Sequence, residues 1–276
     1  NDGKIVVGYC KYSNFASSDP CKWTRTGEGT WKIEKLPLPE GYSNGLALYV
    51  SSDGRTIGGL AINKGSSIAC YWIDGQCHVV TCTGDDVELA NKKQMRMIAV
   101  SPNGKYFIIS LSSRSDYRLY DVEKAKTITL ATFESNDEMR IPTVTNNGDV
   151  FGAMIYGALA MGGMGYYRNF WYQYSSGRIF DLTYYTYLFN PELSMPFPLN
   201  YEDQAQAFPC SVSADGNTIA GNKDVYVALG QTPIAWYLTV NKRDVEIRKN
   251  QMANRQGCSK LVFHGRVTRQ LTIRGR

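Results

Sequence analysis

The sequence is poor in histidine and lacks the short motifs of the common enzyme classes. Its 276 residues include only two histidines, His78 and His264. No Cys-x-x-Cys, His-Glu-x-x-His, phosphate-cradling loop or dinucleotide fingerprint occurs. Cys77 and His78 are neighbours on a predicted strand, so they belong to opposite faces and do not form one site. We therefore predict no metal site, no cofactor and no catalytic residue.

Long apolar runs are missing as well. No stretch of 18 apolar residues occurs, so the sequence encodes no transmembrane segment. No signal peptide is visible, and the first residue is not methionine. Because the chain starts within a repeat, we expect a leader or a longer upstream segment to have been removed or left out.

Cysteine is present but forms no dense framework. The odd count excludes a fully paired monomer, and the spacing is not that of a small disulfide-rich domain. Cys21 and Cys70 each stand two residues before a tryptophan, a position that suits a small buried hydrophobe. Cys10 and Cys21 flank one predicted loop and are the first candidates for a disulfide in an oxidising compartment. The seven cysteines are Cys10, Cys21, Cys70, Cys77, Cys82, Cys210 and Cys258.

What the sequence does have is a repeated five-residue phrase of the form Val-Ser-x-Asp-Gly. Four copies stand at 50–54, 100–104, 144–148 and 212–216, and a fifth is cut short at 1–3. Asp and Asn tolerate left-handed backbone, Gly adopts positive φ without a clash, and the Ser or Thr hydroxyl can bond to the turn. Each phrase therefore predicts a tight turn between two strands. The turn residues are Asp53, Gly54, Asn103, Gly104, Asn147, Gly148, Asp215 and Gly216.

The residues after each phrase repeat too. A large apolar residue stands three positions after each glycine, at Val6, Ile57, Phe107, Phe151 and Ile219. An aromatic residue follows 16 to 23 positions after the glycine, at Trp23, Trp72, Tyr120, Trp171 and Trp236. A second turn and a last apolar stretch complete a unit of about four strands.

The period of these units suits one architecture. The glycines are 51, 50, 44 and 68 residues apart. Four-stranded antiparallel units at this period are typical of a β-propeller. We therefore predict an all-β protein in which residues 1–240 form about five four-stranded blades.

Charge is concentrated in the C-terminal segment, residues 241–276. It carries ten Lys and Arg against Asp244 and Glu246, a net of +8, whereas the whole chain is +5, so residues 1–240 are −3. One interpretation is a patch for an anionic partner such as nucleic acid or a membrane surface. Another is a β segment that completes the first blade and closes the ring, because an open sheet edge invites aggregation. A small extra β segment or disorder is a third. Phe263 is the one aromatic residue in this segment, which argues against a nucleic-acid reader.

Two copies carry a resemblance to known families. Residues 212–221 with Ala235-Trp236 resemble the HAF-type repeats of bacterial extracellular proteins. Residues 100–110 with Arg118–Asp121 look more like the Ser-Pro-Asp-Gly-Lys phrase of general bacterial propeller repeats. The resemblance implies blade architecture and a secreted, periplasmic or cell-surface protein of a bacterium. It transfers no catalytic residue, because propellers host many functions.

The fourth repeat carries two long insertions and the best functional lead. One is a Gly- and Met-rich loop at 156–168, and the other starts at 183. Their aromatic residues predict a platform for a sugar or a peptide, because aromatic faces give contact area at low entropy cost. Alternatively, they cover the blade edge or contact a partner protein. The candidate ligand-binding residues are Tyr166, Tyr167, Arg168, Tyr184, Tyr185 and Tyr187.

Three functions are compatible with these patterns. The one we favour is a non-catalytic extracytoplasmic module that binds a glycan, a peptide or a partner protein. A polysaccharide-acting enzyme is the second, and it would need two acids converging on one propeller face. The third is a purely structural domain of a surface protein.

Overall fold

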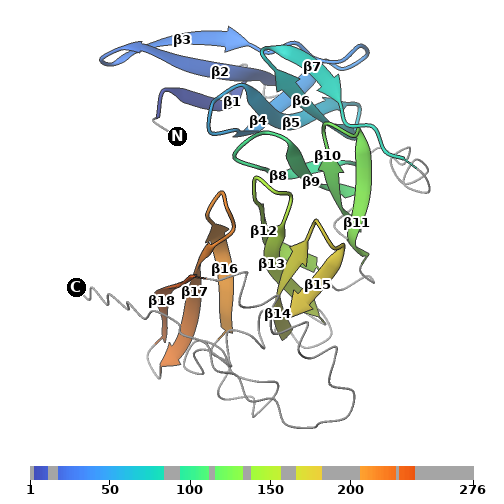
Figure 1. Cartoon of the computed structure of the whole chain (residues 1–276). Helices are drawn as coiled ribbons and strands as arrows, with labels where there is room; N and C mark the ends of the chain where they lie inside the picture. Colours follow the sequence, from blue (N-terminus) through green and yellow to red (C-terminus); the bar gives the residue numbers. More distant parts are fainter. Residues whose placement is uncertain are drawn as a thin grey trace, which may run out of the picture.

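The computed structural model describes residues 3–11, 18–83, 94–111, 116–132, 138–156, 166–181, 206–227 and 230–239. Within these ranges every regular element is a β-strand, and the strands form five antiparallel sheets. Figure 1 shows the sheets following one another in chain order, from blue to orange. In the described part of the chain, no helix is long and apolar enough to cross a membrane.

Each sheet pairs strands that are consecutive in the chain, and we number the sheets in chain order. Sheet 1 contains β1 (Ile5–Lys11), β2 (Ser18–Gly27) and β3 (Thr30–Lys35). Sheet 2 contains β4 (Asn44–Val50), β5 (Thr56–Asn63), β6 (Ser66–Ile73) and β7 (Gln76–Val79). Sheet 3 contains β8 (Arg96–Val100), β9 (Tyr106–Leu111), β10 (Asp116–Asp121) and β11 (Lys126–Thr132). Sheet 4 contains β12 (Glu138–Val144), β13 (Val150–Tyr156), β14 (Tyr166–Gln173) and β15 (Arg178–Asp181). Sheet 5 contains β16 (Gln206–Val212), β17 (Thr218–Val227) and β18 (Gly230–Thr239).

The repeated phrase forms the turn between the first two strands of sheets 2 to 5. In sheet 2, Gly54 has φ +75° and its amide donates to the carbonyl of Ser51 at 3.0 Å. The Ser51 hydroxyl donates to Asp53 Oδ1 at 2.6 Å and accepts the Thr56 amide at 3.0 Å. Asp53 Oδ1 also accepts the Arg55 amide at 3.0 Å. The short polar side chains thus satisfy the turn's own backbone, as the phrase predicts.

The turn of sheet 4 is one residue shorter than the turns of sheets 2, 3 and 5. Residues of sheet 4 that were matched to the other repeats by counting from the glycine are therefore matched one position too late. Val144 pairs with Val150, whereas Val50 pairs with Ile57. The structural counterpart of Ile57 is therefore Val150 and not Phe151. A one-residue shift moves a side chain to the other face of a sheet, so counting from the glycine gave the wrong face here.

The aromatic equivalences change in the same way. Tyr172, which pairs with Val150, occupies the place that Trp72 has in sheet 2. Trp171 lies on the opposite face and stacks on Phe151, with ring centroids 5.8 Å apart. In sheet 5, Leu238 pairs with Ile219, and Trp236 stands two positions earlier, opposite Gly221.

The core lies between successive sheets, which pack face to face. We call the face toward the preceding sheet the leading face and the face toward the following sheet the trailing face. Between sheets 2 and 3, Tyr71 of the trailing face contacts Phe107 of the next leading face, with ring centroids 5.0 Å apart. Between sheets 3 and 4, Ile108 and Leu119 pack with Val150 in the same manner.

The turns of neighbouring sheets are also joined to one another. The Ser52 amide donates to the Pro102 carbonyl at 2.7 Å, and the Asn103 amide donates to Asn146 Oδ1 at 2.8 Å. The Asn146 amide in turn donates to the Ala214 carbonyl at 2.8 Å. One continuous hydrogen-bonded row therefore links the turns of sheets 2 to 5.

Candidate functional site

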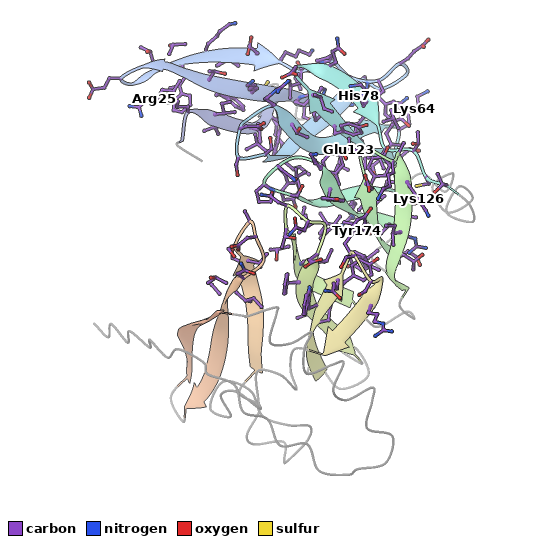
Figure 2. The ribbon with its side chains drawn as sticks, viewed as in Figure 1. Arg25, Lys64, His78, Glu123, Lys126 and Tyr174 are labelled. Atoms are coloured by element: carbon purple, nitrogen blue, oxygen red, sulfur yellow. The ribbon has the colours of Figure 1, made fainter. Side chains whose placement is uncertain are left out.

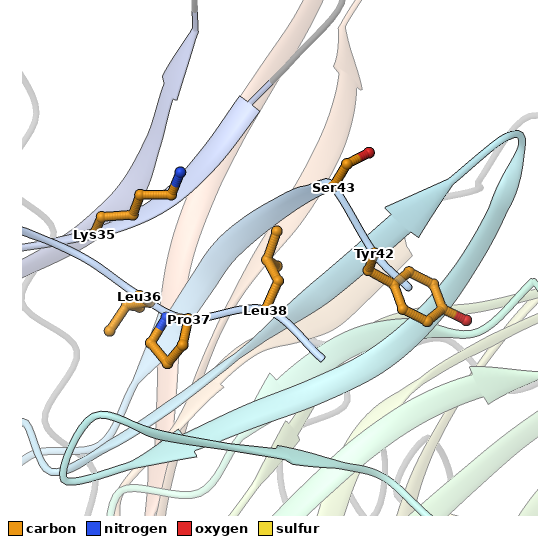
Figure 3. A pocket seen from close by; sticks show the side chains of 6 residues that line it. All are labelled: Lys35, Leu36, Pro37, Leu38, Tyr42 and Ser43. Carbon is orange, nitrogen blue, oxygen red and sulfur yellow. The ribbon is translucent and has the colours of Figure 1, made fainter. Parts of the chain in front are cut away.

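An open pocket lies beside the segment that connects sheet 1 to sheet 2. Its volume is about 490 Å³, within the range of small-ligand sites. Figure 3 shows the side chains that line it. The lining residues are Lys35, Leu36, Pro37, Leu38, Tyr42 and Ser43.

Hydrogen bonds to both flanking sheets hold this connecting segment. The Leu36 amide donates to the Pro20 carbonyl at 2.8 Å, and the Leu36 side chain is buried. The indole N–H of Trp72 donates to the Pro37 carbonyl at 2.6 Å. Because proline also fixes φ, the wall of the pocket is ordered before any ligand arrives.

The polar groups of the pocket come from its rim. Lys35 Nζ lies 2.7 Å from Asp19 Oδ2, whose side chain is only 6% exposed, while the Lys35 side chain is 62% exposed. Tyr42 is half-buried, and Ser43 is exposed. The pocket thus combines an ammonium, a phenol and a hydroxyl with the apolar side chains of Pro37 and Leu38.

The leading face of sheet 1 is a second feature, because it is open to solvent. Val6, Trp23 and Ile33 form a cross-strand row on this face. Val6 is 48% exposed and Ile33 is 59% exposed, whereas Ile57, the counterpart of Val6 in sheet 2, is buried. Sheet 1 therefore carries a blade-packing face that is uncovered within the described residues.

The predicted aromatic platform falls only partly within the described residues. Tyr166, Tyr167 and Arg168 begin β14, and their backbones pair with the end of β13 at 154–156. They are strand residues, whereas the sequence placed them in a loop. Consecutive strand positions belong to opposite faces, so the two tyrosine positions do not share a face. Tyr184, Tyr185 and Tyr187 lie outside the described residues, and the platform remains a prediction.

A polar cluster around the buried carboxylate of Asp121 joins sheets 3 and 4, and Figure 2 labels its member Tyr174. The Tyr174 hydroxyl donates to Asp121 Oδ2 at 2.5 Å and accepts from Lys124 Nζ at 2.5 Å. Lys124 Nζ lies 3.2 Å from Asp121. Burial, followed by the hydrogen bond to Asp121, raises the pKa of Tyr174. A phenol that keeps its proton in this way fastens two sheets together rather than acting as a base.

Metal ligands do not gather in the part of the chain that the structure describes. Across these residues, no group of three or more His, Cys, Asp and Glu side chains could hold an ion. His78 instead stacks on Tyr71, with ring centroids 5.1 Å apart.

Comparison with known proteins identifies the architecture. No model of a known protein family matches the chain, and no curated protein matches its sequence. Among solved structures, the tricorn protease matches with a TM-score of 0.50 and 9% identity, over 87% of this chain and 23% of that one. Tricorn is a β-propeller protein. The fold is of the β-propeller type.

Two further solved structures match the chain at similarly low identity. Prolyl oligopeptidase B from Galerina marginata matches with a TM-score of 0.50 and 9% identity, over 88% of this chain and 31% of that one. A putative TolB from Agrobacterium tumefaciens matches with a TM-score of 0.46 and 10% identity, over 86% of this chain and 77% of that one. The chain spans less than a third of the tricorn protease and of the oligopeptidase, and likeness at this level of identity concerns the fold alone.

Sequence reasoning passed over the pocket between sheets 1 and 2. Its signal is the run Leu-Pro-Leu-Pro at 36–39, between two strands of adjacent repeats. Such a run predicts a rigid, extended connection, but it does not reveal that Trp72 will anchor it.

Proposed function

We propose that this chain is a non-catalytic propeller-type binding module and that the pocket at 35–43 is its ligand site. The observation that supports this most is the pre-ordered wall, fixed by the bond from Trp72 to Pro37 at 2.6 Å. A rigid wall lowers the entropy lost on binding.

The side chains of the pocket favour a glycan or a short peptide. The face of Tyr42 offers contact area to a sugar ring or a proline ring. The Ser43 hydroxyl and the Lys35 ammonium can bond to hydroxyl or carbonyl oxygens. In keeping with the HAF-type resemblance, we place the protein outside the cytoplasm of a bacterium.

The test is a glycan array and a peptide array probed with the intact protein. Ligands that bind are then measured against the Tyr42→Ala variant, which should lose at least tenfold in affinity (about 1.4 kcal/mol). Tyr9→Ala is the matched control, because Tyr9 is an exposed tyrosine of β1 that does not line the pocket.

Two outcomes contradict the proposal. Binding that survives Tyr42→Ala but is lost in a Tyr166→Ala, Tyr167→Ala double variant would move the site to the fourth repeat. The absence of any ligand on both arrays would defeat the binding function itself.

We also propose that the propeller ring closes by packing sheet 5 onto the leading face of sheet 1, with a strand from residues 241–276 completing the contact. Three described interfaces of this kind follow one another in sheets 1 to 4, so the open face of sheet 1 continues an established pattern. Sheets 1 and 5 each show three strands in the described residues, and Ala220 of sheet 5 is exposed.

Charge opposes the approach of the C-terminal segment to sheet 1. Residues 3–35 contain six Lys and Arg and three Asp and Glu, a net of +3, while residues 241–276 are +8. Apolar packing must therefore supply the attraction, and added salt should strengthen the closed state by screening the repulsion.

A further inference from the structure

Two thiols meet across the first strand pair of sheet 1. Gly8 pairs with Cys21 and Cys10 pairs with Asp19, so the two cysteines lie on the same face, one diagonal step apart. Their sulfur atoms are 3.3 Å apart. Cys21 is 3% exposed, and Cys10 is more accessible.

Sheet 2 holds a second pair that serves as an internal comparison. Cys70 has the position of Cys21, two residues before the tryptophan of its strand, and its partner is Cys77 on the neighbouring strand β7. Cys70 is fully buried in the core between sheets 1 and 2, and Cys77 packs against that core. The pair in sheet 1 lies instead on the leading face, beside exposed Val6.

The two thiols of sheet 1 differ in their accessibility, because Cys21 is buried and Cys10 is not. Burial, followed by the hydrogen bond with Cys10, raises the pKa of Cys21 to about 11. Because the thiolate is the attacking species, a buried thiol of this kind is a poor first nucleophile. The more accessible Cys10 is therefore the point of entry for a reagent.

We propose that Cys10 and Cys21 form a disulfide by exchange with a low-molecular-weight disulfide. The Cys10 thiolate attacks one sulfur of the reagent, forms a mixed disulfide and releases one thiolate. Cys21 then loses its proton to solvent and attacks the Cys10 sulfur, which expels the second thiolate. The protein loses two electrons and two protons, and the reagent becomes two thiols.

The product would tie β1 to β2 and close the chain between residues 10 and 21. A cross-link over a loop of this length restricts the unfolded chain and should stabilise the fold. We expect the melting temperature of the oxidised protein to exceed that of the reduced protein by something on the order of 5 °C.

The test is incubation of the full chain with oxidised glutathione, alkylation of the remaining thiols, and a non-reducing tryptic map. Lys11 lies between the two cysteines, so the bond appears as peptide 5–11 joined to peptide 12–22. We expect this species to dominate and to disappear with dithiothreitol. Cys77→Ser is the matched control and should leave it unchanged.

The opposite result is equally clear. The proposal is wrong if, after prolonged incubation, Cys10 still carries glutathione and Cys21 can still be alkylated. It is also wrong if Cys21 forms a disulfide with a cysteine other than Cys10. Cys10→Ser should abolish both the joined peptides and the thermal shift. If that variant does not fold, the map of the unmodified chain decides the question alone.

Discussion

At the scale of single residues, the turn glycines combine a backbone role with a packing role. Gly104 has φ +72°, and a Cβ at this position would collide with Thr56 of sheet 2. Gly29 has nearly the same φ, +70°, but a Cβ there would meet nothing within 4 Å. An alanine at Gly29 therefore costs only the backbone strain of positive φ, whereas an alanine at Gly104 adds a steric clash with Thr56.

We expect Gly104→Ala to lower the free energy of unfolding by about 2–4 kcal/mol and Gly29→Ala by about 1 kcal/mol. Urea unfolding followed by circular dichroism measures both. Equal effects in the two variants would show that the turn of sheet 3 does not press against sheet 2.

The carboxylate of Asp53 makes the turn of sheet 2 sensitive to acid. The hydrogen bonds from the Ser51 hydroxyl and the Arg55 amide hold the pKa of Asp53 below its usual value. In the unfolded chain the pKa of an aspartate is about 3.9, and in the folded chain that of Asp53 is lower. Ionised Asp53 therefore stabilises the fold at pH values above about 3.9, and this contribution disappears as the pH falls through the folded pKa.

Asp53→Asn should therefore lower the stability at pH 7 and flatten its loss between about pH 4 and pH 2, so that the variant and the unmodified chain converge in acid. Asn103 shows that the amide fits, because its Oδ1 accepts the equivalent bonds from Ser101 and Lys105 at 2.7 and 3.1 Å. Urea midpoints across this pH range provide the measurement. An acid profile identical to that of the unmodified chain would contradict the assignment.

At the scale of elements, the Leu-Pro-Leu-Pro connection depends on one tryptophan. Trp72 is fully buried and satisfies the Pro37 carbonyl through its indole N–H. Trp72→Phe removes this donor and leaves a small void, so we expect a loss of about 2–3 kcal/mol. Tyr9→Phe, at an aromatic residue that is 43% exposed on the other face of sheet 1, should stay within about 0.5 kcal/mol of the unmodified chain. Chemical denaturation of both variants tests this, and similar losses would argue against the anchoring role.

The sequence was a good guide to elements because the phrases encode turns through side chains that bond locally. Those bonds depend on neighbours such as Ser51, Asp53 and Arg55, which are visible in any five-residue window. The register of sheet 4 was missed because its turn is one residue shorter, which pairs Val150 with Val144, while the repeated phrase itself looks the same as in the other sheets. The pocket was missed because it depends on Trp72, which is 35 residues away from Pro37 in the chain.

At the scale of the whole molecule, the open face of sheet 1 gives a test of ring closure. Val6 is 48% exposed on this face although its counterpart Ile57 is buried, and Ile179 is 49% exposed on β15. If closure buries Val6, Val6→Asp should cost about 2–4 kcal/mol, while Ile179→Asp should cost little. Thermal unfolding compares the two variants. Equal, small effects would show that the face of sheet 1 stays open in solution.

The C-terminal segment gives a second test of closure. Deletion of residues 258–276 should leave a product that aggregates, because a sheet edge would lose its cover. Light scattering and the melting temperature report the outcome. A truncated chain that is as soluble and as stable as the full one would make the segment an accessory to the ring.

The row of amides that runs from Ser52 through Asn103 and Asn146 to Ala214 has an evolutionary implication. Two of the joints run from amide to carbonyl at the third residue of the phrase, and the joint between sheets 3 and 4 starts instead at Asn103, because Pro102 has no amide hydrogen. A gene that gained or lost one such unit would therefore need only a local change at the third or fourth phrase residue to restore a joint, and selection could then alter the number of units while keeping most of their design.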